Sequence, residues 1–160
     1  MTKQLFWLAL VPTLASACAP PAKRSVETGV DTAGVRAAFF SLVAAVKRLD
    51  ATATLAAYDT NSAFAHVFDG NLVRSRVAYD GVIKSMYPTL KAIDSHIDSV
   101  FVVPLSPGAA VVIAAYHETV TDTARHETAE RGMWTNVFVR RADGWKIAAG
   151  HSTHVALPAK

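Results

Sequence analysis

The chain has very little cysteine: Cys18 is the only one among its 160 residues. An intramolecular disulfide is therefore impossible. The sequence also lacks the paired cysteines and the His-x3-His spacing of local metal sites, and it has neither a Gly-x-Ser-x-Gly elbow nor a phosphate-binding loop. These absences exclude disulfide scaffolds, local zinc motifs, serine-elbow hydrolases and phosphate-loop enzymes. We therefore expect no metal and no cofactor.

Charge of either sign is also scarce. The chain carries 16 basic and 13 acidic residues, a formal net charge of +3, and 51% of its residues are hydrophobic. That balance is typical of a globular domain. The small basic excess forms no stripe along the sequence, so we expect no nucleic-acid partner.

No hydrophobic run near the N-terminus is long enough to span a bilayer, because the apolar stretch covers only residues 5–11. Lys3 precedes it and small residues follow it, which is typical of an export signal. Residues 15–18, Ala-Ser-Ala-Cys, resemble a bacterial lipobox, in which the cysteine is acylated and becomes the mature N-terminus. We therefore predict lipidation of Cys18. The alternative is an ordinary signal peptide that is cut after Ala17 and leaves a free thiol.

This N-terminus predicts a domain organisation and a location. We expect a lipoprotein signal peptide over residues 1–17, a proline-containing tether over 18–30, one domain over 31–156 and a short tail over 157–160. Ala19, not aspartate, follows the cysteine. By similarity to Gram-negative lipoproteins, this implies sorting to the outer membrane, with the domain facing the periplasm.

Two Asp-Gly pairs predict two β-hairpins, because glycine accepts the positive φ that tight turns require. The longer hairpin joins residues 133–141 to residues 145–155 through Asp143 and Gly144. The shorter one joins residues 63–68 to residues 71–75.

Helical spacing of apolar residues predicts three helices. The first follows a cap at Asp31 or Thr32 and ends before Asp50, and a short second helix covers residues 52–58. The third covers residues 77–90, and Pro88 should kink or end it.

Two further strands, over residues 92–105 and 109–123, precede the long hairpin. We interpret residues 122–131 as a polar connection. Helices followed by a run of antiparallel strands predict an α+β fold.

The closing hairpin carries a family pattern at Trp134, Val137, Phe138, Arg140, Arg141, Asp143, Gly144, Trp145, Ile147, His151 and Thr153. It resembles the last strands of the nuclear transport factor 2-like (NTF2-like) superfamily, and most closely its small bacterial SnoaL-like and DUF4440-type domains. The resemblance implies a cone in which a strongly curved antiparallel sheet wraps around N-terminal helices and leaves a pocket at its open end. It also implies a homodimer through the open sheet face. It does not imply one activity, because the superfamily hosts isomerases, dehydratases and assembly domains.

Similarity to the association domain of calmodulin-dependent kinase places the pocket on the strand face of Tyr116, Asn136 and Ser152. The candidate ligand-pocket residues are Tyr58, His66, Tyr87, Tyr116, Trp134, Asn136 and Ser152. The alternative for Tyr87 and Trp134 in particular is a core role, with the ring buried and one donor satisfied. We expect His151 and Trp145 to serve the fold and not catalysis.

Two carboxylates could lie near the pocket mouth. We expect Asp59 to cap a chain turn and Glu118 to face water at a strand end. His151 and His154 are three positions apart on one strand and so lie on opposite faces, where they cannot share a metal as neighbours.

These observations leave three functions open. The leading interpretation is an envelope lipoprotein that binds a small, largely apolar ligand in its cone. The second is a cofactor-free isomerase, dehydratase or hydrolase that uses His66 or Asp59 with Tyr116. The third is a structural envelope subunit whose cone is filled by its own side chains. An open cavity would exclude the third interpretation, and a buried acid or base inside it would favour the second.

Overall fold

The computed structural model describes residues 29, 31–60 and 63–158. Cys18, the predicted signal peptide and all of the predicted tether except residue 29 lie outside the described residues. Within them, no helix is long and apolar enough to cross a membrane. The elements in chain order are α1 (Thr32–Lys47), α2 (Ala51–Ala56), β1 (Ala65–Phe68), β2 (Asn71–Val73), α3 (Arg76–Met86), the 3-10 turn η1 (Tyr87–Thr89), β3 (Leu90–Ser106), β4 (Ala109–Asp122), β5 (Glu127–Arg141) and β6 (Gly144–Ala156).

Each α-helix begins at a side chain that caps it. Asp31 accepts a hydrogen bond from the backbone N–H of Gly34 at 2.7 Å, and Asp50 accepts one from Ala53 at 2.9 Å. Ser75 does the same for α3. These oxygens satisfy N–H groups that the first helical turn leaves without a partner. Helix α3 ends before Pro88, as predicted, and the chain continues as the 3-10 turn.

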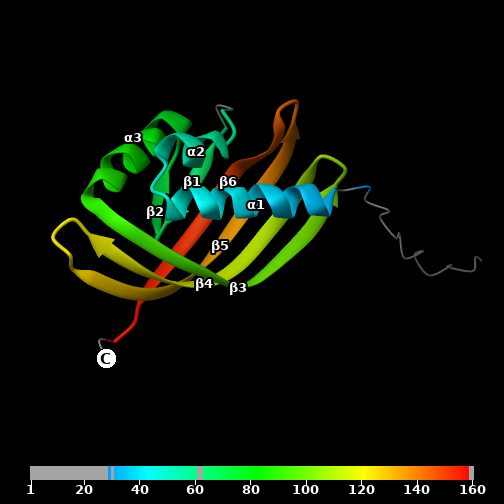
Figure 1. Cartoon of the computed structure of the whole chain (residues 1–160). Coiled ribbons are helices and arrows are strands. Elements are labelled where there is room, and N and C mark those ends of the chain that lie inside the picture. The colour runs from blue at the N-terminus through cyan, green and yellow to red at the C-terminus, as the bar shows by residue number, and fades with distance from the viewer. Residues whose placement is uncertain (1–28, 30, 61–62, 159–160) are drawn as a thin grey trace, which may run out of the picture.

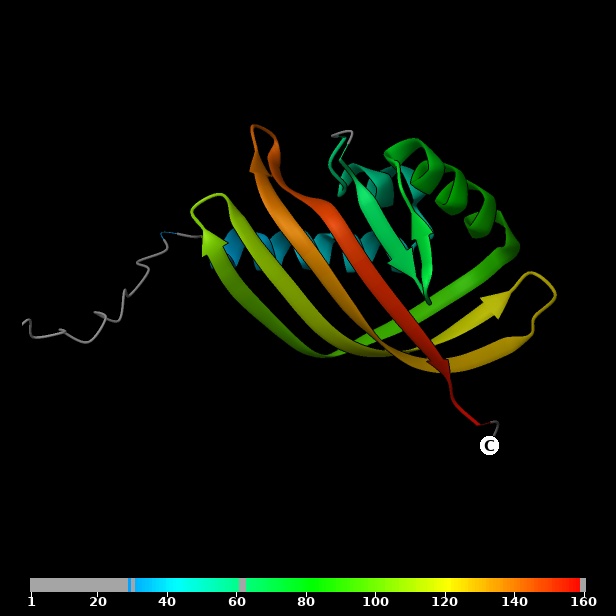
Figure 2. The same cartoon turned by 180° about the vertical axis from the view of Figure 1, so that it is seen from behind.

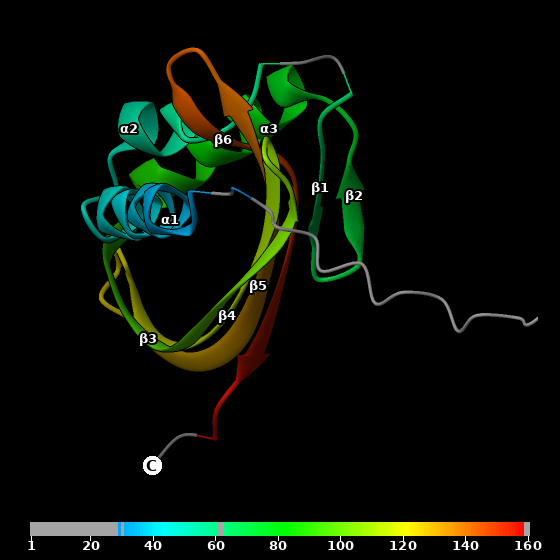
Figure 3. The same cartoon turned by 90° about the vertical axis from the view of Figure 1, so that its right-hand side faces the viewer.

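The strands form one sheet in the order β2-β1-β6-β5-β4-β3. The sheet curves around α1, which lies along its concave side (Figures 1 and 3). Val35, Phe39 and Leu42 of α1 are buried against it. The predicted α+β cone is therefore confirmed.

One pair of strands departs from the expected antiparallel pattern. β1 runs parallel to β6, and Figure 2 shows the two side by side. The chain leaving α2 already runs alongside β6, because the Ile147 N–H donates to the Ala57 carbonyl at 2.9 Å and the Asp59 N–H donates to the Ile147 carbonyl at 2.8 Å. β1 continues in that direction and covers the edge of β6, which would otherwise stay unpaired.

The predicted polar connection over residues 122–131 is too long, because only residues 123–126 join β4 to β5. β5 begins at Glu127, where it pairs with Thr121, and the ladder continues through Glu130, which lies opposite Glu118. Polar residues are compatible with this strand because one face of an antiparallel sheet can be solvated. The difference matters, because it brings Glu130 onto the concave face.

Strict alternation also fails once in β6. Strict alternation would place Trp145 and Ile147 on the face opposite Ser152, yet all three side chains are buried on the concave side. The pairing shifts from Val137 with Ala149 to Phe138 with Ile147, so Ala148 is an extra residue in a β-bulge. A bulge reverses the alternation along the strand that carries it. In β4 and β5 the alternation holds, and Tyr116 and Asn136 lie on the buried face as expected.

Candidate functional site

A cavity of about 640 Å³ lies between the helices and the concave face of the sheet. Its wall is mainly apolar and includes Leu42 of α1, Ile83 of α3 and Ile93 of β3. All predicted pocket residues except Tyr116 line it. The polar groups that reach it are Thr54, Tyr58, His66, Asp69, Asn71, Tyr79, Tyr87, Glu118, Thr128, Glu130, Asn136, Ser152 and His154.

His66 is the most unusual of these groups. The residue is only 4% exposed, and neither ring nitrogen has a hydrogen-bond partner within the part of the chain that the structure describes. The imidazole packs against Phe68 at 4.3 Å and Tyr79 at 5.0 Å between ring centroids. Burial, and secondarily the neighbouring His151 and His154, lower the pKa of His66 to about 4. The ring is therefore neutral near pH 7 and offers one donor and one acceptor.

Gly150 makes the space for that imidazole. It pairs with both His66 and Asn136 in the ladders. A Cβ atom at this position would lie 2.5 Å from His66 Nδ1 and 2.6 Å from Asn136 Oδ1. The missing side chain thus lets two polar groups from neighbouring strands approach each other.

Ser152 lies on the next inward position of β6. It is 2% exposed, and its hydroxyl has no hydrogen-bond partner among the described residues. Its cross-strand neighbours on the concave face are Phe68 and Trp134. The unpartnered atoms of His66 and Ser152 therefore belong to one region of the cavity wall.

Tyr116 lies on the predicted face but does not line the cavity. Its hydroxyl donates to the carbonyl of Thr153 at 3.1 Å, and its ring packs against Trp134 at 4.7 Å. Gly132 makes this possible, since a Cβ there would lie 2.4 Å from the tyrosine hydroxyl oxygen. Burial raises the pKa of Tyr116. The Tyr116 hydroxyl therefore already has a hydrogen-bond partner within the protein.

The helical side contributes three tyrosines. Tyr87 shares a hydrogen bond of 3.0 Å with Thr54, and the rings of Tyr58 and Tyr79 lie 4.6 Å apart. Burial raises the pKa of each tyrosine. All three remain neutral in the physiological range, so they can serve as hydrogen-bonding or packing groups.

The expectation that Glu118 faces water was wrong. Its side chain is buried, the residue is 7% exposed, and its carboxylate accepts a hydrogen bond from Ser95. Burial raises the pKa of Glu118 to about 7. The strand pairs extend beyond it, so the position that looked like an exposed strand end lies inside the cone.

Sequence reasoning did not select Glu130 and His154 as site residues. Both are half-buried and line the cavity. The alternation of side chains along a strand could have identified them, because it places Glu130 on the face of Trp134 and His154 on the face of Ser152. Glu130, however, lies in the segment for which the sequence predicts a polar connection, so the alternation along the predicted strand does not point to it.

Asp59 does not join His66 or Tyr116. It is buried at a separate hollow, where Arg141 donates to both of its carboxylate oxygens, with Nε to Oδ1 at 3.2 Å. Its backbone N–H is bonded to β6. The structure thus places Asp59 in an ion pair between the α2 end and the end of β5.

The remaining motif residues support the closing hairpin. Gly144, after Asp143, has a φ of +116°. Trp145 is buried under the guanidinium of Arg140, which lies 5.6 Å from its ring. His151 is exposed and lies outside the cavity lining.

A cavity enclosed by helices and one curved, open sheet defines a cone-shaped α+β domain. Within this class the chain belongs to the SnoaL-like domain family, whose model matches residues 35–158. A comparison with curated proteins found no match.

Solved structures with the same fold come from the NTF2-like superfamily. A "putative dehydratase from the NTF2-like family" of Streptomyces avermitilis is 18% identical, with a TM-score of 0.70 over 81% of this chain and 98% of that one. A ketosteroid isomerase-like protein of Erwinia carotovora is 22% identical, with a TM-score of 0.65 over 78% of this chain and 96% of that one. An NTF2-like superfamily protein of Salmonella enterica is 16% identical, with a TM-score of 0.63 over 79% of this chain and 89% of that one. Similarity at these identities establishes the fold, and function must be argued from the cavity.

Proposed function

We propose that the cavity binds a small, largely apolar molecule that carries a hydrogen-bonding group. The observation that supports this most directly is the pair of buried, unpartnered polar groups on its wall, His66 and Ser152. An unsatisfied buried donor or acceptor costs roughly 1–3 kcal/mol. A ligand that bonds to both groups recovers this free energy.

The size and chemistry of the cavity agree with this proposal. Its volume of about 640 Å³ is in the usual range for small-molecule sites, and apolar side chains make most of its wall. A cavity of this size also argues against the structural-subunit alternative, which requires the cone to be filled by its own side chains.

Native mass spectrometry of the full chain, purified from its own host in mild detergent, tests the proposal. We expect a retained small-molecule mass that disappears on denaturation. His66→Phe and Ser152→Ala should each reduce the retained fraction at least several-fold, because each removes one polar partner. The matched controls are His96→Phe and Ser106→Ala, which change exposed residues. Equal retention in all four variants would contradict the proposed anchor.

The second candidate is a cofactor-free enzyme that uses His66 as a proton acceptor on the bound molecule. The observation that favours it is the neutral imidazole in the cavity wall, with both nitrogens available. The dehydratase and isomerase descriptions of similar structures agree with it. The low pKa makes His66 a weak base at neutral pH, so binding is the better-supported function.

A recovered ligand would separate these two functions. Incubation of the ligand with the wild-type protein and with His66→Gln, followed by mass analysis, should show conversion by the wild type alone if the protein is an enzyme. Unchanged ligand with both proteins would leave binding as the function.

We also propose that the domain is held at the envelope through acylated Cys18, as the lipobox resemblance implies. Cys18→Ser should leave unprocessed precursor and abolish labelling by a fatty-acid probe. Normal processing and release of this variant would contradict the anchor.

A further inference from the structure

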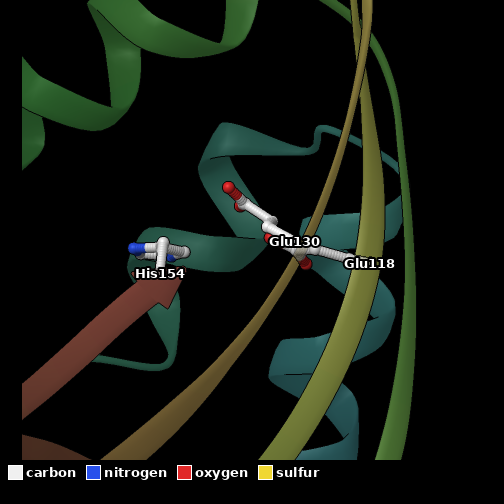
Figure 4. A group of neighbouring side chains, drawn as sticks. All are labelled: Glu118, Glu130 and His154. Carbon is white, nitrogen blue, oxygen red and sulfur yellow. The ribbon is translucent and has the colours of Figure 1, made fainter. Parts of the chain in front are cut away.

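Three side chains from neighbouring strands meet at one end of the cavity. Glu118 of β4 and Glu130 of β5 lie directly opposite each other in the ladder, and His154 extends from β6. One potential ligand atom from each residue lies within 4.8 Å of the other two. Figure 4 shows the two glutamates side by side, with the imidazole across from them. Oxygen and nitrogen atoms thus converge from three strands.

The two carboxylates are placed unfavourably unless a positive charge joins them. Like charges directly opposite each other on neighbouring strands destabilise a sheet. Among the described residues that line the cavity there is no lysine or arginine, although the whole chain has a net charge of +3. A cation bound between the two carboxylates would relieve this repulsion.

Two of the three side chains are oriented by outer partners. Ser95 donates to the Glu118 carboxylate. Asp69 accepts from the backbone N–H of His154 at 2.7 Å and contacts its Nδ1 at 3.0 Å. A carboxylate bound to one imidazole nitrogen fixes the tautomer and leaves the lone pair on the other nitrogen, which is the usual arrangement around a metal-ligating histidine.

Ser152, which the proposed function uses as a ligand anchor, also lies beside these three side chains. It occupies the next inward position to His154 on β6, is 2% exposed and has an unpartnered hydroxyl at the same cavity. A buried hydroxyl without a partner requires a polar species nearby. A hydrated cation or its bound ligand would supply one.

We propose that Glu118, Glu130 and His154 bind a divalent transition-metal ion at this end of the cavity. Two carboxylates and one imidazole form a three-residue set that suits zinc or manganese. Three protein ligands leave coordination positions open toward the cavity. The sequence showed no local ligand pattern because each ligand comes from a different strand.

The geometry requires only a modest adjustment to close around an ion. Ligand atoms on one zinc ion lie roughly 3.5 Å apart, since each bond is about 2 Å long. The observed separations are at most 4.8 Å. Glu130 is half-buried, and a change of its side-chain rotamer can bring its carboxylate closer to Glu118 and His154.

Metal binding to the full chain tests this inference independently of the organic ligand. After treatment with a chelator, the protein is titrated with Zn²⁺ or Mn²⁺ by calorimetry, and the stoichiometry is checked by native mass spectrometry. We expect one ion per chain and a higher melting temperature. The Co²⁺-loaded protein should show visible d–d absorption bands.

Glu130→Gln and His154→Gln should each weaken binding at least tenfold, in the range found when a metal site is disturbed. Both residues are half-buried, so the variants should fold, and the melting temperature of the metal-free proteins verifies this. The matched control is His117→Gln, which changes an exposed histidine paired with Asp98 at 2.7 Å. Absence of stoichiometric binding, or loss of binding in His117→Gln with retention in the other two variants, would overturn the proposal.

Discussion

At the scale of single residues, the cavity depends on polar groups that the fold leaves without partners. His66 illustrates this best, because it is neutral, buried and surrounded by aromatic rings. The titratable groups near it are His154 on the same face of β6, His151 on the other face of that strand, and the adjacent Tyr58 and Tyr79. Its neutrality contributes to ligand recognition and also makes stability depend on pH.

His66 should make the protein less stable in mild acid. Its pKa is about 4 in the folded state and near 6.5 when unfolded, so protons bind preferentially to the unfolded chain. Above about pH 6.5 the imidazole is neutral in both states, so the free energy of unfolding does not depend on His66. As the pH falls toward 4, the free energy of unfolding decreases by up to about 3 kcal/mol. Chemical unfolding from pH 7.5 to 4 measures it. His66→Phe should flatten this dependence, and an unchanged slope would contradict the assignment.

Gly150→Ala should disturb the packing of the His66 imidazole from the β6 side. The new Cβ would lie 2.5 Å from His66 Nδ1, so the imidazole or the strand must move. Overpacking of this kind costs about 1–3 kcal/mol. Gly81→Ala is the control, because a Cβ there meets nothing within 4 Å and should stabilise α3 by about 0.5–1 kcal/mol. Guanidinium unfolding compares the two variants. Equal stability would show that His66 is not confined as described.

At the scale of elements, the sequence predicted most of the fold, because the signals for helices and turns are local. The Asp-Gly turns, the Asp31 cap and the stop at Pro88 all lie where expected. The errors arose where distant pairing decides the structure. The start of β5 depends on its partner β4, and the bulge at Ala148 depends on the register with β5. Neither the start of β5 nor the bulge can be predicted reliably from the local sequence.

The candidate site was predictable to the extent that alternation along strands held. Alternation separated the two faces, and similarity to the kinase association domain selected the face of Tyr116, Asn136 and Ser152; Asn136 and Ser152 line the cavity, and Tyr116 is buried on the concave face. Neither could show that Tyr116 would bend over Gly132 and bond to Thr153. Which side chain reaches a cavity depends on packing between strands, and that information is tertiary.

The β1–β2 hairpin should be sensitive to its turn. Gly70 has a φ of +85°, and a Cβ there would meet nothing within 4 Å. Gly70→Ala therefore introduces backbone strain without a clash, at a cost of about 1–2 kcal/mol. Because this hairpin carries His66 and Asp69, amide exchange should increase in β1 and at the edge of β6. Unchanged exchange with unchanged stability would mean that the turn does not set the position of the hairpin.

At the scale of the whole molecule, the concave face holds the cavity and the opposite face of the sheet is open (Figures 2 and 3). Large apolar side chains are exposed toward one end of β3, with Phe101 63% exposed, Val103 43% and Leu105 53%. The predicted homodimer through the open sheet face would cover such side chains. It remains a prediction, as does the lipid anchor.

Sedimentation of the full chain in mild detergent tests the dimer. We expect a dimer for the wild type and a monomer for Phe101→Asp, because the new charge would be buried in the contact. Val77→Asp changes a residue that is 83% exposed on α3 and should leave the dimer intact. A monomeric wild type, or a dimer that survives Phe101→Asp, would contradict a contact through this part of the sheet.

The central claim is that the cone is a binding cavity with a polar anchor at His66 and Ser152. A crystal structure of the protein, purified from its own host without added ligand, tests it most directly. We expect electron density for a non-protein molecule in the cavity, with a polar atom within hydrogen-bond distance of His66 or Ser152. A cavity closed by side chains, with these two groups bonded to the protein itself, would contradict it.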